Sequence, residues 1–138
     1  MQRPFHYAFP VRDLAETRRF YGEILGCPEG RSSDTWIDFD FFGNQLSAHL
    51  CDKIPERTAT GHVDNITVPV PHFGAVLHAD QFDRIARRFT ELHTKFVIAP
   101  RIRFEGRPGE HKTMFLLDPS GNALEFKTFR NAACVFEP

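Results

Sequence analysis

The sequence has few of the residues that would assign it to a small, cysteine-stabilised class. Its 138 residues include three cysteines, Cys27, Cys51 and Cys134, which are widely spaced and form no CxxC pair. An odd number of such cysteines argues against a disulfide framework and against a cysteine-based zinc site. The first residues, MQRPFHYAF, lack the basic-then-apolar pattern of a signal peptide. We therefore expect a cytoplasmic protein.

The sequence also lacks a dominant charge and a long apolar run. It has 17 basic and 18 acidic residues, which give a net charge of −1 and no basic field for nucleic acid. The basic run at residues 84–88 is typical of the solvent-facing side of a helix. No apolar run approaches the ~20 residues that span a membrane. Neither nucleic acid nor a membrane is an expected partner.

Phenylalanine is abundant, with 15 residues against two tyrosines and one tryptophan. It fills cores and lines apolar clefts without needing a hydrogen-bond partner. With 41% hydrophobic and 25% charged residues, the chain is long enough for one compact domain or for two half-sized repeats packed together.

The order of predicted elements occurs twice. A first strand, a helix and two alternating strands are predicted at residues 5–11, 14–25, 35–42 and 45–50, with a further short strand near Arg31. A polar stretch with several prolines follows, typical of a linker or lid loop. The order then restarts with a strand, a helix and three or four strands at residues 72–77, 81–93, 95–104, 111–117 and 123–129. We predict an α+β fold in a single domain, 1–138, with module one at about 4–51, a linker at about 52–70 and module two at about 71–129.

Side chains at the predicted helix ends support these boundaries. Asp13 is expected to cap the first helix, with Glu16 three residues on as its capping-box partner. Gly26 is expected to end that helix. Asp80 is expected to cap the second helix.

Polar residues interrupt the apolar strands at corresponding places in the two modules. Alternation places His6 opposite Tyr7 and Phe9 in the first strand, and His72 opposite Phe73 in the restart strand. Glu125 and His49 lie in the last strands of their modules, on the face that points away from the helices. If the modules pack as pseudo-symmetric halves, these four side chains converge in one cleft. Two imidazoles and a carboxylate suit a divalent metal with open coordination positions.

Each of these residues alone has an ordinary structural explanation. A single histidine on a half-buried strand is more often hydrogen-bonded than metal-bound, and a single glutamate in a last strand more often faces solvent. Their matching placement in a duplicated unit favours the metal site.

Three stretches resemble the vicinal oxygen chelate superfamily, which contains glyoxalases, bleomycin-resistance proteins and extradiol dioxygenases. They are FHYAFPVRDLAETRRFYGEILG, the restart strand PHFGAVL and the ending MFLLDPSGNALEF. The resemblance implies a pair of βαβββ modules forming a half-open mixed barrel around a metal. It implies His6, His72 and Glu125 as metal ligands for Fe(II), Mn, Ni or Zn, and a homodimer as the assembly.

The sequence departs from the glyoxalase pattern at one strand. Glyoxalase-like members usually offer a second carboxylate from the last strand of the first module, whereas QLSAHL contains no acid. Either His49 or Gln45 replaces it as a fourth group, or neither binds. The remaining His-His-Glu set resembles the facial triad of Fe(II) oxygenases, and equally the thiol-transferring resistance members.

Further residues are candidates for the cleft. Alternation places His111, Thr113 and Phe115 on the cleft side of their strand, and His111 is either an acid–base group or an exposed loop-edge residue. Lys127, on the face of Glu125, either holds a substrate anion or reaches solvent. Trp36, Asp38 and Asp40 line either the cleft or a dimer contact. We expect catalytic roles for His111 and His49, and substrate contacts from Trp36, Thr113, Phe115 and Lys127.

Three functions follow from these expectations. The first is a metal-dependent dioxygenase or lyase acting on a small molecule that chelates the metal through vicinal oxygens. The second is a module of the same fold that binds a small aromatic or hydrophobic compound without turnover. The third is a resistance protein that transfers a thiol to an electrophile.

Overall fold

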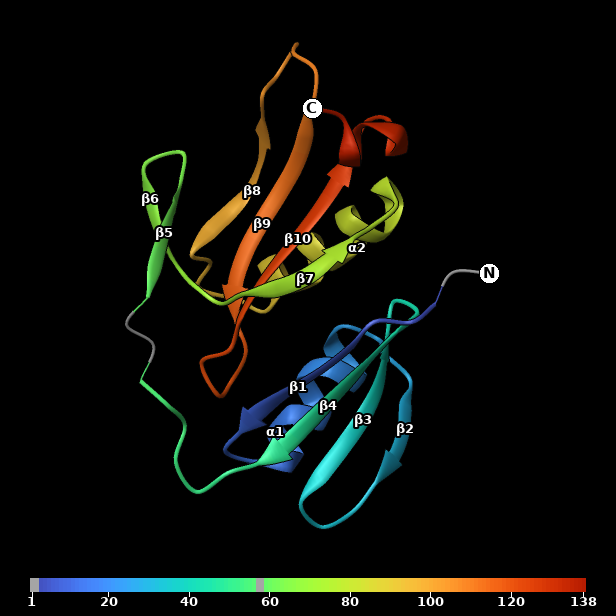
Figure 1. Cartoon of the computed structure of the whole chain (residues 1–138), viewed down its shortest axis with the longest axis vertical. Helices are drawn as coiled ribbons and strands as arrows, with labels where there is room; N and C mark the ends of the chain where they lie inside the picture. The colour runs from blue at the N-terminus through green and yellow to red at the C-terminus, as the bar shows by residue number, and fades with distance from the viewer. Residues whose placement is uncertain (1–2, 57–58) are drawn as a thin grey trace. The chain divides into compact units, whose positions relative to one another are not determined.

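The chain folds into two compact units in the computed structural model, which describes residues 3–56 and 59–138 (Figure 1). Unit one comprises residues 3–56 together with the turn Asp118–Asn122. Unit two comprises residues 59–117 and Ala123–Pro138.

Unit one is a four-stranded sheet with a helical segment. Its elements are β1 (His6–Val11), α1 (Leu14–Thr17), the π-helix η1 (Arg18–Ile24), β2 (Glu29–Ser32), β3 (Trp36–Phe41) and β4 (Asn44–Leu50). The strands lie in the order β1-β4-β3-β2. The pair β1–β4 is parallel, and the other two pairs are antiparallel.

Local signals explain the boundaries of the helical segment. The Asp13 side chain accepts a hydrogen bond of 2.8 Å from the Glu16 backbone N–H, which confirms the predicted N-cap. The predicted helix is an α-helix only in its first turn; the Leu25 N–H then donates to Phe20 O, five residues back, as in a π-helix. Gly26 follows with φ of 75°, a conformation that glycine adopts without strain.

Apolar residues of β3 and the helical segment form the core of unit one. Ile37, Phe39 and Phe41 are buried, as the predicted alternation requires. The fully buried Tyr21 ring lies 5.5 Å from the rings of both Phe9 and Phe39. The hairpin between β3 and β4 turns at Phe42 and Gly43, both with positive φ.

The turn Asp118–Asn122 connects β9 to β10 along the chain but belongs to unit one. The buried Asp118 carboxylate accepts a hydrogen bond of 2.8 Å from the Tyr21 hydroxyl. It also accepts from the backbone N–H groups of Ser120 and Asn122 and from the Asn122 side chain. The Asn122 amide donates in addition to Pro10 O at 2.9 Å. The DPSGN sequence is therefore a hydrogen-bonded insert in unit one.

Unit two repeats the architecture after a two-stranded hairpin. Its elements are β5 (Thr60–Val63), β6 (Ile66–Pro69), β7 (Phe73–Val76), α2 (Ala79–Glu91), β8 (Ile98–Arg103), β9 (His111–Leu117), β10 (Ala123–Phe129) and the 3-10 helix η2 (Ala132–Phe136). The main sheet has the order β7-β10-β9-β8, and β7 pairs with β10 in parallel. The predicted α+β fold of two βαβββ modules is confirmed.

The structure differs from the sequence-based expectations in two places and decides one alternative that the sequence left open. The stretch expected as a linker, of which residues 57–58 lie outside the described part, contains the hairpin β5–β6. Helix α2 begins at Ala79 with His78 as its N-cap residue, and Gln81 Oε1 accepts from the His78 N–H at 3.1 Å, so the predicted Asp80 cap is wrong. The stretch 95–104 forms a single strand, β8, whose register shifts between Ile98 and Arg101, where Pro100 lies.

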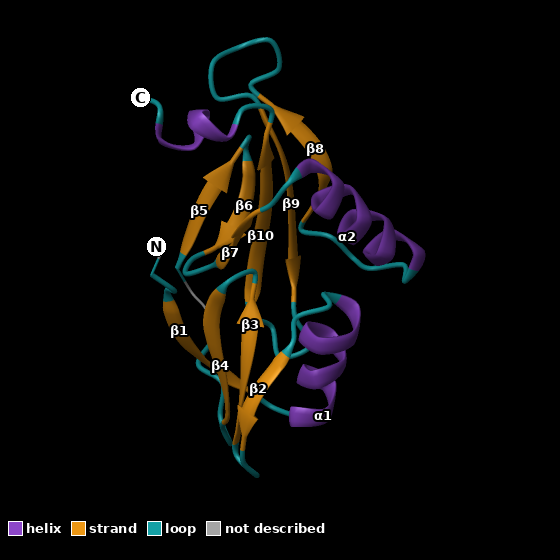
Figure 2. Cartoon of the chain, turned by 90° about the vertical axis from the view of Figure 1, so that its right-hand side faces the viewer, coloured by secondary structure: helices purple, strands orange, loops and turns teal. Residues whose placement is uncertain are grey.

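The two faces of the main sheet of unit two are covered differently. Helix α2 lies along one face and buries Phe82, Ile85 and Phe89 (Figure 2). The hairpin β5–β6 lies on the opposite side, where Val68 joins a buried cluster with Ile98, Phe115 and Ala123. We call this second side the polar face, because it carries His72, Glu125 and Lys127. Among the described residues, no helix is long and apolar enough to cross a membrane.

Candidate functional site

His72 is held in one orientation at the entry to β7. Its Nδ1 lies 2.8 Å from Pro69 O. A carbonyl oxygen can only accept, so Nδ1 is the donor, and in the neutral ring Nε2 presents a lone pair. The ring also meets Phe115 edge-on, with centroids 4.8 Å apart. This fixed tautomer is the one found in histidines that ligate metals through Nε2.

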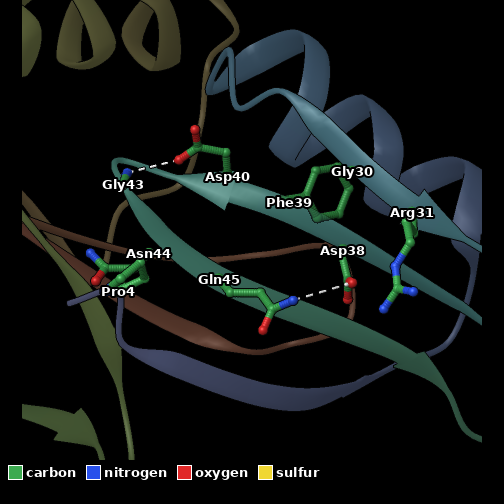
Figure 3. Close-up of a pocket in the computed structure, with 9 residues that line it drawn as sticks. All are labelled: Pro4, Gly30, Arg31, Asp38, Phe39, Asp40, Gly43, Asn44 and Gln45. Atoms are coloured by element: carbon green, nitrogen blue, oxygen red, sulfur yellow. Dashed lines mark hydrogen bonds between the residues drawn. The ribbon is translucent and has the colours of Figure 1, made fainter.

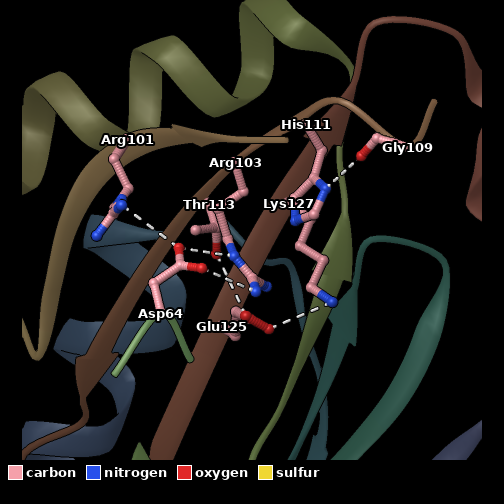
Figure 4. Close-up of polar contacts among 8 residues, drawn as sticks. All are labelled: Asp64, Arg101, Arg103, Gly109, His111, Thr113, Glu125 and Lys127. Carbon is pink, nitrogen blue, oxygen red and sulfur yellow. Dashed lines mark hydrogen bonds and ion pairs between the residues drawn. The ribbon is translucent and has the colours of Figure 1, made fainter. Parts of the chain in front are cut away.

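Glu125 is a buried carboxylate in the middle of β10. Its Oε2 accepts a hydrogen bond of 3.2 Å from the Thr113 hydroxyl of β9, and its Oε1 lies 3.4 Å from Lys127 Nζ (Figure 4). In the parallel pairing with β7, Gly74 is opposite Glu125. A Cβ at Gly74 would lie 1.6 Å from the Glu125 carbonyl oxygen. Only glycine therefore lets β7 approach β10 at this point.

One pocket of about 240 Å³ brings these side chains together. Its lining includes His72, Glu125 and Lys127, together with the residues of β7. Alternation had placed His72 and Glu125 on one face, and the strand register agrees. The His72 imidazole and the Glu125 carboxylate thus line a common space in unit two.

The chemistry of this donor set fits a divalent cation. Imidazole nitrogen and carboxylate oxygen are ligands of zinc, manganese, nickel and iron. Thr113 and the Pro69 carbonyl orient the two donors from behind. Lys127 already compensates the charge of Glu125, so a cation at Oε1 competes with its ammonium group. Neither unit, in the part of the chain that the structure describes, gathers three His, Cys, Asp or Glu side chains into a potential metal site by itself.

The other predicted ligand and two further candidates belong to unit one. His6 begins β1 and is exposed, opposite Gln45 in the register. His49 is exposed near the end of β4, opposite the half-buried Trp36 of β3. Opposite residues share a face, so His6, His49 and Trp36 all lie on the face of this sheet that points away from the helical segment.

Asp38 on the same face is a residue whose environment the sequence left open. It is 8% exposed, and its Oδ1 accepts a hydrogen bond of 2.6 Å from the Ser47 hydroxyl. It lines a pocket of about 510 Å³ with Arg31, Gln45 and others (Figure 3). The acid inside the apolar run WIDFDF was the available signal, but its burial depends on the pairing of β3 with β4.

His111 lies apart from the pocket of His72 and Glu125. In the register it is opposite Phe129, two rows away from Glu125. Its Nδ1 is 2.8 Å from Gly109 O, and its ring stacks on Phe129 at 4.8 Å. Among the described residues its buried Nε2 has no hydrogen-bond partner. It lines a separate pocket of about 190 Å³.

The remaining predicted substrate residues differ in their surroundings. Thr113 is fully buried against Glu125, Phe115 is fully buried in the cluster beneath the hairpin, and Lys127 is half-buried in the pocket.

The polar face also carries two arginines, Arg101 and Arg103. Arg103 donates to the Asp64 carboxylate through Nε at 2.9 Å and Nη2 at 3.2 Å, and Arg101 Nη2 lies 3.4 Å from the same carboxylate (Figure 4). Arg103 also lies over the Phe104 ring at 4.8 Å. Asp64 is in the turn of the β5–β6 hairpin, so these contacts fasten the hairpin to the sheet.

Comparisons with known proteins agree with this architecture. A family model described as Glyoxalase/Bleomycin resistance protein/Dioxygenase superfamily matches residues 3–126. The chain is 34% identical to a glyoxalase/bleomycin resistance protein/dioxygenase from Alicyclobacillus acidocaldarius, with 98% of this chain and 97% of that chain covered and a TM-score of 0.78. A search of curated proteins found no match.

More distant solved structures share the fold. The fosfomycin resistance protein FosX from Listeria monocytogenes is 17% identical, with 97% of this chain and 98% of that chain covered and a TM-score of 0.72. FosX from Mesorhizobium loti is 20% identical, with 96% and 97% covered and a TM-score of 0.67.

Proposed function

Because this chain belongs to the glyoxalase/bleomycin resistance protein/dioxygenase superfamily, we propose that it is a divalent-metal-dependent dioxygenase or lyase. Its substrate is a small molecule that chelates the metal through two adjacent oxygens. The observation that carries the proposal is the pocket shared by His72, with its Nε2 lone pair, and the buried Glu125.

His72 and Glu125 hold the metal from unit two, and His6 supplies the third ligand in this proposal. The metal would be Fe(II), Mn, Ni or Zn, and it would supply Lewis acidity toward two adjacent substrate oxygens. Pro69 and Thr113 keep the two donors of unit two in their binding orientations.

Lys127 provides a positive charge beside the pocket. Its ammonium group pairs with Glu125 Oε1 at 3.4 Å and its side chain is 36% exposed, so the group can turn toward an anionic substrate oxygen once a cation binds Glu125. His49 and His111 remain our candidates for proton transfer. The Nε2 of His111 is buried, while His49 is exposed.

Metal binding by substituted chains tests this proposal. Chains purified without chelator are titrated with Mn, Fe(II), Ni and Zn, and bound metal is measured by elemental analysis. We expect His72→Ala, Glu125→Ala and His6→Ala each to weaken binding by at least about tenfold, since each removes a donor. The control is His62→Ala, an exposed histidine of β5. Parental metal affinity in the His72 and Glu125 variants would show that the assignment is wrong.

A thiol-transferring resistance function is the second candidate. Three cationic side chains, Arg101, Arg103 and Lys127, lie on the polar face, which suits an anionic electrophile. The test is thiol-dependent, manganese-stimulated loss of an epoxide substrate such as fosfomycin. Tight ligand binding by a metal-free chain without turnover would instead favour a binding protein. We further propose a homodimer, which light scattering measures directly.

A further inference from the structure

Asp38 is a buried carboxylate that the proposed metal chemistry does not use. Its side chain lies in the middle of β3 with 8% exposure. Among the described residues no ion pair joins it to a Lys, Arg or His. Burial of a charged carboxylate without a cationic partner is destabilising unless hydrogen bonds compensate it. Such a residue calls for a reason other than stability.

The two oxygens of this carboxylate are satisfied unequally. Oδ1 accepts a short bond of 2.6 Å from the Ser47 hydroxyl. Within the described part of the chain, Oδ2 has a single hydrogen-bond contact, at 3.4 Å to the Gln45 amide nitrogen, close to the limit for a hydrogen bond. A carboxylate oxygen can accept two hydrogen bonds. Oδ2 therefore retains capacity for a donor that comes from outside the protein.

A pocket provides the space for such a donor. It measures about 510 Å³, within the range of small-molecule sites. Asp38 and Gln45 face each other across β3 and β4, and the Arg31 guanidinium lies on the same side (Figure 3). Pro4 and Phe39 add apolar lining. The pocket thus combines a hydrogen-bond acceptor at Asp38 with apolar surface around it.

The register shows that this arrangement parallels the pocket of unit two. Ala8 pairs with Ser47 across β1 and β4, as Gly74 pairs with Glu125 across β7 and β10. Ser47 therefore holds the position of Glu125. In unit two a hydroxyl of β9 donates to the carboxylate of β10, whereas in unit one a hydroxyl of β4 donates to the carboxylate of β3. The carboxylate that β4 lacks is present one strand away.

We propose that Asp38 binds the hydroxyl or amino group of a small organic molecule in this pocket, with Ser47 and Gln45 fixing the carboxylate. The ligand presents its donor to Oδ2 and its apolar body to the surrounding lining. This binding goes beyond the metal-dependent activity and requires neither a metal nor His72 and Glu125.

Amide chemical shifts of the full chain test the proposal. The probes are phenol and benzylamine, with anisole and toluene as matched molecules that lack the donor. In the parent we expect saturable shifts at the amides of Gly43 and Gln45, with phenol or benzylamine binding about tenfold more tightly than its match, because the hydrogen bond is to a charged group. The titration is repeated in His72→Ala with EDTA, where the same preference is expected even if the metal proposal fails.

Substitutions then assign the preference to Asp38. Asp38→Asn should bring the affinity ratio of probe to match close to one. The control Asp34→Asn removes the same charge from the exposed bend before β3 and should leave the ratio unchanged. If the amide spectrum shows that Asp38→Asn is unfolded, Asp38→Thr replaces it, since threonine suits a strand. The proposal is overturned if neither donor probe gives saturable shifts, if the matched molecules bind equally well in the parent, or if the folded Asp38 variant keeps the preference.

Discussion

Units one and two have the same strand order but place their carboxylates on different strands. Each sheet pairs its first and last strands in parallel and adds two antiparallel strands. In unit two the buried acid is Glu125 on the last strand, held by Thr113. In unit one the buried acid on a strand is Asp38, on the strand before the last, and it is held by Ser47. The two sheets therefore share their strand order, but the buried acid lies one strand earlier in unit one than in unit two.

The surfaces around the two acids differ in a related way. Gly74 leaves no side chain between β7 and the Glu125 backbone, whereas the corresponding residue of β1 is Ala8. In the described part of the chain, the hairpin β5–β6 packs against the polar face of unit two and fastens there through Asp64. The repeated fold therefore determines which face of each sheet can carry a site, and single residues determine what that face can bind.

The largest effect expected is that of Gly74→Ala. The added Cβ would lie 1.6 Å from the Glu125 carbonyl oxygen, and because this is a backbone atom the clash cannot be relieved without separating β7 from β10. We expect the free energy of unfolding to fall by about 3 kcal/mol, the upper end for overpacking. Urea unfolding followed by circular dichroism measures it.

The corresponding change in unit one is the control for Gly74→Ala. Ala8→Gly removes a methyl group from the matching position of β1 and should lower the unfolding free energy by about 0.5–1 kcal/mol, the usual effect of glycine in a strand. Equal losses in the two variants would mean that β1 and β7 pack equally closely against their parallel partners, which would contradict the special role of Gly74.

A second prediction concerns the turns that join the last two strands of each sheet, β3–β4 and β9–β10, which differ in length. The β3–β4 turn is two residues long, whereas Asp118–Asn122 is longer and bonds to Tyr21. Tyr21→Phe removes the hydroxyl that donates to the buried Asp118 carboxylate. We expect a loss of about 2 kcal/mol in unfolding free energy, typical of a hydrogen bond to a charged group.

A double-mutant cycle separates this bond from general packing. Asp118→Asn is combined with Tyr21→Phe, and the coupling energy between the two changes is measured from thermal or urea unfolding. A coupling indistinguishable from zero would show that the bond contributes nothing specific to unit one.

The two helix starts give a third and smaller effect. Asp13 caps α1 through Glu16, whereas Asp80 lies in the first turn of α2 without capping it. Asp13→Ala should lower the unfolding free energy by about 1 kcal/mol. Asp80→Ala should lower it by only about 0.3 kcal/mol, the contribution of a charge near a helix start. Thermal unfolding of both variants, side by side, measures the difference, and equal losses would contradict the assigned caps.

These elements show what the sequence alone could predict. Strand alternation placed His72, Glu125 and Lys127 on one face because period-2 patterns survive in any sheet with one buried side. It also placed Asp38 opposite Ile37 and Phe39. The bond between Asp38 and Ser47 could not be predicted, because it depends on the register of two strands across a turn whose residues, Phe42 and Gly43, lie one position earlier than expected.

Two further differences arose from competing local signals. Asp80 and His78 both precede an apolar helical stripe, and propensity favours the aspartate as a cap, whereas Gln81 bonds to the His78 N–H and starts the helix earlier. The hairpin β5–β6 was not predicted, because the surrounding prolines favoured a linker or loop. The dipeptide Asp64-Asn65, both with positive φ, was the available turn signal.

The last prediction concerns Asp64→Asn, at the hairpin that covers unit two alone in the described part of the chain. Asp64 pairs with Arg103 and Arg101 but is 30% exposed, so solvent screens the pairs. We expect a loss of about 0.5 kcal/mol in global stability, with faster amide exchange confined to β5 and β6. Asp83→Asn, which breaks one exposed pair with Lys112, is the control and should leave the hairpin amides unchanged. The effect of Asp64→Asn should shrink at high salt because the charges are partly exposed. Unchanged exchange in β5 and β6 would mean that the apolar cluster around Val68 holds the hairpin without the ion pairs.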